Sequence, residues 1–233
     1  MRIKLIDILY PRRCPICNDI VKEGLICKEC EDTLSEIKKP FCIKCGKQLD
    51  DKDRLYCADC KRNEHAFVEN RAVYAYQGEI KNAMYDLKYA NRRENAEFFG
   101  EAIVRKYGSY IKALGIEVIV PVPLHKKRLK IRGYNQTALI ASYIGEKLSI
   151  PVNTELLRRE QSTTAQKLLN NRERKNNVKS AFKVYENDVK YDRILLIDDI
   201  YTTGATLHYA AKELLDHGMG AIYTMTVCIG RGY

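Results

Sequence analysis

The sequence has no long hydrophobic stretch. Its 233 residues contain no run of 18 apolar residues, so a conventional transmembrane helix is not expected. The first residues, MRIKLIDILYP, also lack the long apolar core and the small-residue cleavage site of a signal peptide. We therefore expect a cytoplasmic protein without an integral membrane segment.

Cysteine is scarce outside one short region. Eight of the nine cysteines lie between residues 14 and 60, where they form four C-x-x-C pairs, the only internal repeat in the chain. The pairs are Cys14/Cys17, Cys27/Cys30, Cys42/Cys45 and Cys57/Cys60. In a cytosolic chain this regularity favours metal over disulfide bonds, and two pairs can supply the four thiolates of a Zn²⁺ site. We therefore expect two structural zinc sites.

The spacing leaves open which C-x-x-C pairs share a zinc ion. Sequential pairing is the simplest arrangement, and a crossed pairing of the first pair with the third is also compatible with the spacing. The region has too few apolar residues to fold alone, so zinc is expected to fold it, and a structural role is favoured over nucleic-acid contact. Neither Cys228 nor His65 is assigned to these sites: Cys228 is interpreted as a small core residue of an apolar strand, and His65 as a surface residue.

Acidic residues are few in the middle of the chain. The net charge is +10, and residues 121–180 have 13 Lys/Arg against 4 Asp/Glu, whereas residues 1–65 have 14 against 12. The excess of cations predicts a polyanion or a pyrophosphate as the partner. A solvated basic face that aids solubility is the alternative interpretation.

The stretch RILLIDDIYTTGAT, residues 193–206, predicts a site for a phosphorylated sugar. A buried apolar strand at 194–197 is followed by two carboxylates, a turn of threonine and glycine, and a helix from 207 to 217. Such a turn offers N–H groups and hydroxyls beside the positive end of the helix dipole, which suits a phosphate. The carboxylates repel phosphate but suit sugar hydroxyls or a phosphate-bound Mg²⁺. An ordinary turn with capping residues is the alternative.

The rest of the chain alternates between strand and helix patterns. Strands are expected at 68–76, 117–120, 151–157, 181–185, 194–197 and 221–229, and helices at 79–89, 92–113, 137–148 and 207–217. This alternation predicts an α/β fold with a parallel sheet and helices on both faces. We expect two domains, a zinc-ribbon domain at 1–65 and an α/β domain at 66–233.

The 193–206 stretch resembles the ribose-phosphate motif of type I phosphoribosyltransferases, with four apolar residues, two acids, an apolar pair and T-T-G-x-T. The resemblance implies that family's fold, and 5-phosphoribosyl 1-pyrophosphate with Mg²⁺ as the ligand. It implies that Asp198 and Asp199 are the catalytic pair and hold the ribose hydroxyls. The residues implied to bind the ligand are Asp198, Asp199, Ile200, Tyr201, Thr202, Thr203, Gly204, Ala205 and Thr206 in the motif, and Pro123, Leu124, His125 and Lys126 in a pyrophosphate loop.

Two other segments are similar to parts of that family. Pro121–Lys127 lies where the pyrophosphate loop belongs, and its prolines give it a fixed shape. Lys88 or Arg92 is a candidate to assist that loop. Residues 158–180 match, in place and polar character, the loop that closes over the site.

A more particular resemblance is to the ComF (ComFC-like) competence family. It rests on the N-terminal zinc ribbon, on VPLHKKRLKIRGYNQ at 122–136, on the polar segment that follows Arg159, and on the 193–206 motif. Many members have one zinc site, whereas this chain has cysteines for two. The family's association with natural transformation implies a role with incoming single-stranded DNA and an ATP-driven DNA translocase.

The acceptor of a transferase reaction is left open, because no base pocket or hood domain is recognisable in the sequence. Three functions stay open. The protein could be a phosphoribosyltransferase, a non-catalytic module that binds or senses phosphoribosyl pyrophosphate, or a single-stranded DNA adaptor. In the last case the basic residues 126–132 and 158–180 would follow the DNA backbone while Tyr134 stacks on bases.

Overall fold

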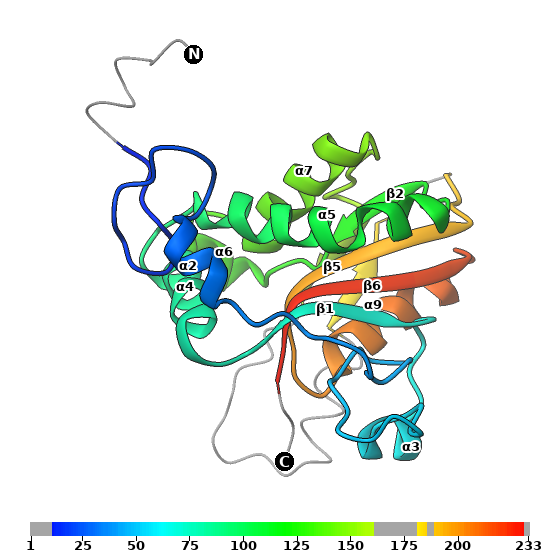
Figure 1. The fold of residues 1–233 in the computed structure, drawn as a ribbon. Coiled ribbons are helices and arrows are strands. Elements are labelled where there is room, and N and C mark those ends of the chain that lie inside the picture. Colours follow the sequence, from blue (N-terminus) through cyan, green and yellow to red (C-terminus); the bar gives the residue numbers. More distant parts are fainter. Residues whose placement is uncertain (1–10, 161–180, 186–188, 231–233) are drawn as a thin grey trace, which may run out of the picture.

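The computed structural model describes residues 11–160, 181–185 and 189–230. Within these ranges, four strands form one parallel sheet in the order β1-β6-β5-β2 (Figure 1). The strands are β1 (Asn70–Ala75), β2 (Val118–Pro121), β5 (Arg193–Tyr201) and β6 (Ala221–Ile229). The parallel α/β sheet predicted from the sequence is confirmed.

Helices cover both faces of the sheet, as predicted. The main helices are α4 (Gly78–Tyr89), α5 (Asn95–Ala113), α7 (Gln136–Leu148) and α9 (Ala205–Asp216). Figure 1 shows α5 and α7 on one face and α9 on the other. None of the helices in the described ranges has the length and hydrophobicity needed to span a bilayer.

The central strand β5 is buried on both faces. Leu195 and Ile197 belong to the core beneath α5 and α7, whereas Ile194 and Leu196 belong to the core beneath α9. Alternate side chains of a strand point to opposite faces, so a doubly covered strand needs apolar residues at every position. This explains the unbroken apolar run in the sequence.

β5 is longer than predicted. It does not end at Ile197 but continues to Tyr201, because its pairing with β6 extends to Ile229. Asp198 and Asp199 therefore lie inside the strand and are held by its ladder, rather than in a loop after it.

Three shorter elements complete this part of the fold. They are α6 (Lys126–Arg132), β3 (Leu157–Arg159) and β4 (Phe182–Val184), and β3 pairs antiparallel with β4. The strand predicted at 151–157 is only partly right, since Val152 forms a single bridge with Ile119 and regular pairing begins at Leu157. The side chain of Asn153 accepts the N–H groups two and three residues ahead, and this turn interrupts the strand.

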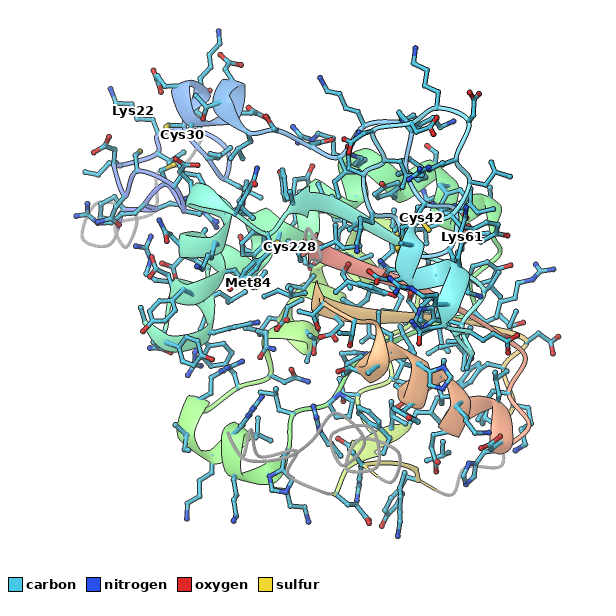
Figure 2. All side chains as sticks on the ribbon, turned by 90° about the horizontal axis from the view of Figure 1, so that it is seen from below. Lys22, Cys30, Cys42, Lys61, Met84 and Cys228 are labelled. Carbon is cyan, nitrogen blue, oxygen red and sulfur yellow. The ribbon has the colours of Figure 1, made fainter. Side chains whose placement is uncertain are left out.

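Two zinc ribbons, which we call the first ribbon (residues 11–33) and the second ribbon (residues 40–62), dock at different places. They include the short helices α2 (Lys28–Thr33) and α3 (Ala58–Arg62). The first ribbon contacts α5 through an Arg12–Glu97 ion pair of 2.6 Å, and the second contacts β1, where the N–H of Asn70 donates to the carbonyl of Lys44 over 2.7 Å. In Figure 2, Cys30 and Cys42 lie on opposite sides of Cys228. The domain boundary at residue 65 stays a prediction.

Gly145 and Gly108 provide a matched test of helix packing. A Cβ at Gly145 would lie 2.5 Å from Cγ2 of Val152 and 2.7 Å from the carbonyl oxygen of Ile150. Gly145→Ala is therefore expected to lower the free energy of unfolding by about 1–3 kcal/mol, measured in urea. A Cβ at Gly108 would meet its nearest neighbour at 3.4 Å, so Gly108→Ala should raise the free energy of unfolding by up to about 1 kcal/mol. Equal changes in the two variants would contradict the close contact of α7 at Gly145.

Candidate functional site

The cysteines of the two ribbons form two four-cysteine clusters. Among the described residues, the four sulfur atoms of each cluster lie within 4.8 Å of one another. The clusters are Cys14, Cys17, Cys27 and Cys30, and Cys42, Cys45, Cys57 and Cys60. The pairing is thus sequential and not crossed. Four thiolates at this spacing fit a tetrahedral Zn²⁺ ion, and the second cluster is more buried than the first.

The ends of β2 and β5 bring the two predicted ligand-binding segments together. These strands are parallel, with Pro121 beside Ile197, and the N–H of Val122 donates to the carbonyl of Ile197 over 2.9 Å. Residues 123–125 therefore leave the sheet beside the end of β5, where residues 198–201 still pair with β6 and the 202–204 turn follows. Both segments lie at the carboxyl edge of the sheet, where open α/β sheets bind their ligands.

Asp199 lies in a buried polar network at this edge. Its carboxylate forms an ion pair of 2.9 Å with Nζ of Lys88, and the side chains are 9% and 15% exposed, respectively. The amide nitrogen of Gln136 donates to the other carboxylate oxygen of Asp199, and Arg132 donates to the amide oxygen of Gln136. Three elements, α4, α6 and α7, thus hold this carboxylate in one orientation.

Asp198 is only partly buried and has a different environment. Its Oδ1 accepts the N–H of Asp199 over 2.8 Å. Burial, together with the charge of Asp199, raises the pKa of Asp198 to about 7, although Lys88 and Arg159 oppose the rise. One member of the acidic pair is therefore fixed by a cation, and the other is available to titrate near neutral pH.

This pKa predicts how stability depends on pH in the ligand-free protein. The pKa of Asp198 is raised in the folded state, so the stability that its protonated form contributes is lost as the pH rises from about 4 to about 7. Asp198→Asn cannot ionise and avoids that loss. The free energy of unfolding of the variant, measured in urea relative to the wild type, should rise by about 2 kcal/mol between about pH 5.5 and about pH 8. If this difference in unfolding free energy stays constant across the range, the raised pKa of Asp198 is contradicted.

The turn at 202–204 has the features expected of an anion site. Gly204 has a φ of 77°, in the left-handed region that favours glycine, and it caps α9. The hydroxyl of Thr203 accepts the N–H of Ala205 over 3.4 Å, and Thr202 and Thr203 are exposed. The other N–H groups in the first turn of α9 have no partner within the helix, and they lie at the positive end of its dipole.

The two apolar residues of the motif direct their side chains into the protein. Ile200 packs half-buried against the core beneath α5 and α7. Tyr201 is 4% exposed and packs in the core beneath α9. Their predicted contact with a ligand would therefore come from the backbone.

The predicted pyrophosphate loop is ordered by His125. The Nδ1 atom of His125 accepts the N–H of Lys127 over 3.2 Å and so caps α6, and its Nε2 lies 3.1 Å from the carbonyl oxygen of Glu160. Pro123 and Leu124 are half-buried, whereas Lys126 is exposed. The predicted closing loop falls mainly on residues 161–180, which lie outside the described residues.

Comparison with known proteins finds relatives that match most of the chain. A sequence model described as the double zinc ribbon domain matches residues 5–61. Competence protein F of Haemophilus influenzae is 30% identical over 219 residues, which cover 90% of this chain and 93% of the relative.

The chain belongs to the ComF family. Competence protein ComFC of Bacillus subtilis is also 30% identical, over 84% of this chain and 80% of the relative. The DNA utilization protein YhgH of Escherichia coli is 27% identical, over 95% of this chain and 98% of the relative. The ComF resemblance inferred from the motifs is therefore confirmed.

Two expectations for this ComF-family protein were wrong. Tyr134 does not face solvent for base stacking: it is 8% exposed, its hydroxyl donates to the carbonyl of Leu87, and Arg93 lies over its ring at 4.5 Å. His65 is half-buried rather than a surface residue, and it stacks on Phe67 with ring centroids 4.9 Å apart. The burial of Tyr134 depends on Leu87 and Arg93, and that of His65 on Tyr201, and all three partners are distant in sequence.

The sequence suggested Lys88 as a helper of the pyrophosphate loop, whereas the structure pairs it with Asp199. The sequence did not indicate Gln136 as a partner of Asp199, or Arg132 as the partner of Gln136. The signal that could have found them is their place in the RGYNQ segment, which leads into α7 and ends on its first residue, Gln136. Arg92, the other suggested helper, turns toward the first ribbon, where it donates to the side chain of Asn18 over 2.6 Å.

Proposed function

We propose that this ComF-family protein binds 5-phosphoribosyl 1-pyrophosphate with Mg²⁺ and acts in the uptake of DNA. The observation that carries the proposal is the position of the acidic pair beside the 202–204 turn at one edge of the sheet. A carboxylate pair alone repels phosphate, and the turn alone offers little to ribose hydroxyls. Together they match both halves of a ribose phosphate.

Each group has a distinct task in this proposal. The turn and the first N–H groups of α9 bind the 5′-phosphate, with the hydroxyls of Thr202 and Thr203. Asp198 and Asp199 bind the ribose hydroxyls, and the ion pair with Lys88 holds the carboxylate of Asp199 in its orientation. Residues 123–126 face the pyrophosphate. Mg²⁺, when bound, would offset the charge of the pyrophosphate group.

Catalysis would require an acceptor, which we leave unassigned. In a transfer reaction the bond from C1′ to the pyrophosphate oxygen breaks, the acceptor forms a new bond to C1′, and positive charge builds on the ribose. Preorganised carboxylates below the ring would stabilise that charge. Release of pyrophosphate in the presence of single-stranded DNA or free bases would support a transferase. Tight binding without release would support a sensing module.

The role in DNA uptake is supported by the names of the relatives, two competence proteins and a DNA utilization protein. The partner we propose is single-stranded DNA, delivered by an ATP-driven DNA translocase. Clusters of four reduced cysteines are typical of the cytoplasm, which is where we propose that the protein acts.

The surface of α4 and α6 favours single-stranded DNA as a direct ligand. α6 has five cations and no acid, and among the described residues Lys126, Lys127, Arg128 and Lys130 form no ion pair. Beside it, Tyr85 and Tyr89 of α4 are 59% and 66% exposed, with ring centroids 4.8 Å apart. Arg132 lies over Tyr89 at 5.3 Å and so joins the cations to the exposed rings. Cations beside open aromatic faces are typical of single-strand binding surfaces.

Replacing both exposed tyrosines is expected to weaken DNA binding. Each base–aromatic stack contributes about 1–3 kcal/mol, so Tyr85→Ala/Tyr89→Ala should raise the Kd for oligo(dT) at least about tenfold. The measurement is fluorescence anisotropy at several salt concentrations. The salt dependence should change little, because it reports the phosphate contacts of α6.

Tyr56→Ala is the matched control, because Tyr56 is an exposed tyrosine (40%) on the second ribbon. It should bind DNA like the wild type. An unchanged Kd in the double variant, or an equal loss in the control, would argue against the α4–α6 surface.

A further inference from the structure

Tyr201 joins the 202–204 turn to the second ribbon. It is the last residue of β5, directly before the turn, and its buried ring packs edge-on against Phe67 with centroids 6.4 Å apart. Its hydroxyl lies 3.3 Å from Nε2 of His65. A Cβ added to Gly204 would overlap that same hydroxyl. The turn therefore rests directly on the side chain of Tyr201.

The chain leaving the second ribbon also contacts the other end of the turn. The N–H of Ala66 donates to Nδ1 of His208 over 3.1 Å, and the N–H of His208 donates to the carbonyl of Gly204 over 2.8 Å. His208 lies in the first part of α9. Residues 65–66 thus contact the protein both before the turn, at Tyr201, and after it.

The second zinc cluster belongs to the same core as these contacts. Three of its cysteines are buried together with Phe67, Tyr201 and Leu207 of α9; they are Cys42, Cys45 and Cys57. Between two ligands of this cluster, Lys44 donates to the carbonyl of Phe67 and lies over its ring at 5.3 Å. The fold of the second ribbon therefore fixes Phe67 and His65, on which Tyr201 packs.

The first ribbon has no comparable connection among the described residues. Its ion pairs with the rest of the described protein lie on α5, where Arg12 pairs with Glu97 and Glu31 pairs with Arg105 over 2.8 Å. The two zinc sites are therefore not equivalent in their relation to the turn, although their ligand sets are the same.

We infer that the zinc-loaded second ribbon holds the 202–204 turn in its anion-binding conformation through Tyr201 and His65. Loss of zinc from the second ribbon lowers the affinity of the turn for phosphate groups, whereas loss of zinc from the first ribbon does not. Tyr201 and His65 are positioning residues that act through the backbone of the turn. The inference rests on the proposed function only where ligand affinity is concerned.

Matched cysteine variants test this inference. Cys57→Ser and Cys27→Ser each remove one ligand at the same position of the two ribbons. Zinc content, hydrogen exchange of the two amides that bond within the turn (Ala205 to the hydroxyl of Thr203 and His208 to the carbonyl of Gly204) and calorimetric affinity for Mg²⁺ with phosphoribosyl pyrophosphate are measured for each full-length protein. We expect Cys57→Ser to speed exchange in the turn at least about tenfold and to weaken binding at least about tenfold. Cys27→Ser should change neither, and equal effects of the two variants would overturn the inference.

Conservative variants separate positioning from general unfolding. Tyr201→Phe keeps the ring and loses only the hydroxyl, and His65→Gln keeps a hydrogen-bonding group that His65→Ala loses. Tyr201→Phe and His65→Ala should speed exchange in the turn while β6 stays protected and both zinc ions stay bound, and His65→Gln should restore most of the protection. Exchange that rises equally in β6, or does not rise in the turn, would refute a positioning role.

The exchange measurement needs no ligand. If the wild type does not bind phosphoribosyl pyrophosphate, the proposed function fails, and the comparison of turn amides still decides the inference.

Discussion

Removal of zinc from both ribbons is expected to unfold residues 11–62 and to leave the four-stranded sheet folded. A structural Zn²⁺ site contributes on the order of 10 kcal/mol of folding free energy, and helices of 6 and 5 residues cannot persist alone. The sheet has its own core between α5, α7 and β5. The measurement is hydrogen exchange after chelation, with mass spectrometry to count bound zinc.

Added zinc, but not magnesium, should restore protection in residues 11–62, because thiolates select zinc. Amides of β5 and β6 serve as the internal control and should stay protected throughout. Ribbons that stay protected after both ions are lost would contradict the structural role of zinc.

Asp199→Asn is expected to lower the affinity for Mg²⁺ with phosphoribosyl pyrophosphate at least about 100-fold, since one preorganised charged contact is lost. The variant also disturbs the network, because a new amide donor would face the amide of Gln136, whose oxygen is already bonded to Arg132. An unsatisfied buried donor costs about 1–3 kcal/mol. Calorimetry measures the affinity, and thermal unfolding should show a Tm lower by a few degrees.

The control for this variant is Asp216→Asn, at the far end of α9. Asp216 pairs with Lys212 on the surface, and the pair is 53% and 49% exposed, respectively. Surface pairs of this kind contribute little, so neither affinity nor Tm should change measurably. If Asp199→Asn binds the ligand as tightly as the wild type, with zinc content unchanged, the carboxylate of Asp199 is not part of the binding site.

Local sequence could predict β5 and α9, because a doubly buried strand and an amphipathic helix both have a clear hydrophobic pattern. It could not predict α6 in the same way. Leu129 and Ile131, the apolar residues of α6, are 42% and 87% exposed, so the helix buries no stripe. It is defined instead by its caps, the side chain of His125 and Gly133 with a φ of 78°. Capping by histidine is not a usual sequence signal.

The composition of the site could be predicted in part. The motif identified the acidic pair and the turn, since their order along the chain is also their order in space. The partners of Asp199 come from α4 and α7, and His65 reaches Tyr201 from 136 residues away. Such contacts depend on how the elements pack, and a single sequence has no local pattern that reports them.

The central claim is that the carboxyl edge of β5 binds phosphoribosyl pyrophosphate. The most direct test is calorimetric titration of the zinc-loaded protein with this ligand and Mg²⁺, beside the variant Asp198→Asn/Asp199→Asn. We expect tight binding by the wild type and none by the double variant, with two zinc ions in each protein. No binding by the zinc-loaded wild type would contradict the claim, and the single-stranded DNA adaptor would then be the leading function.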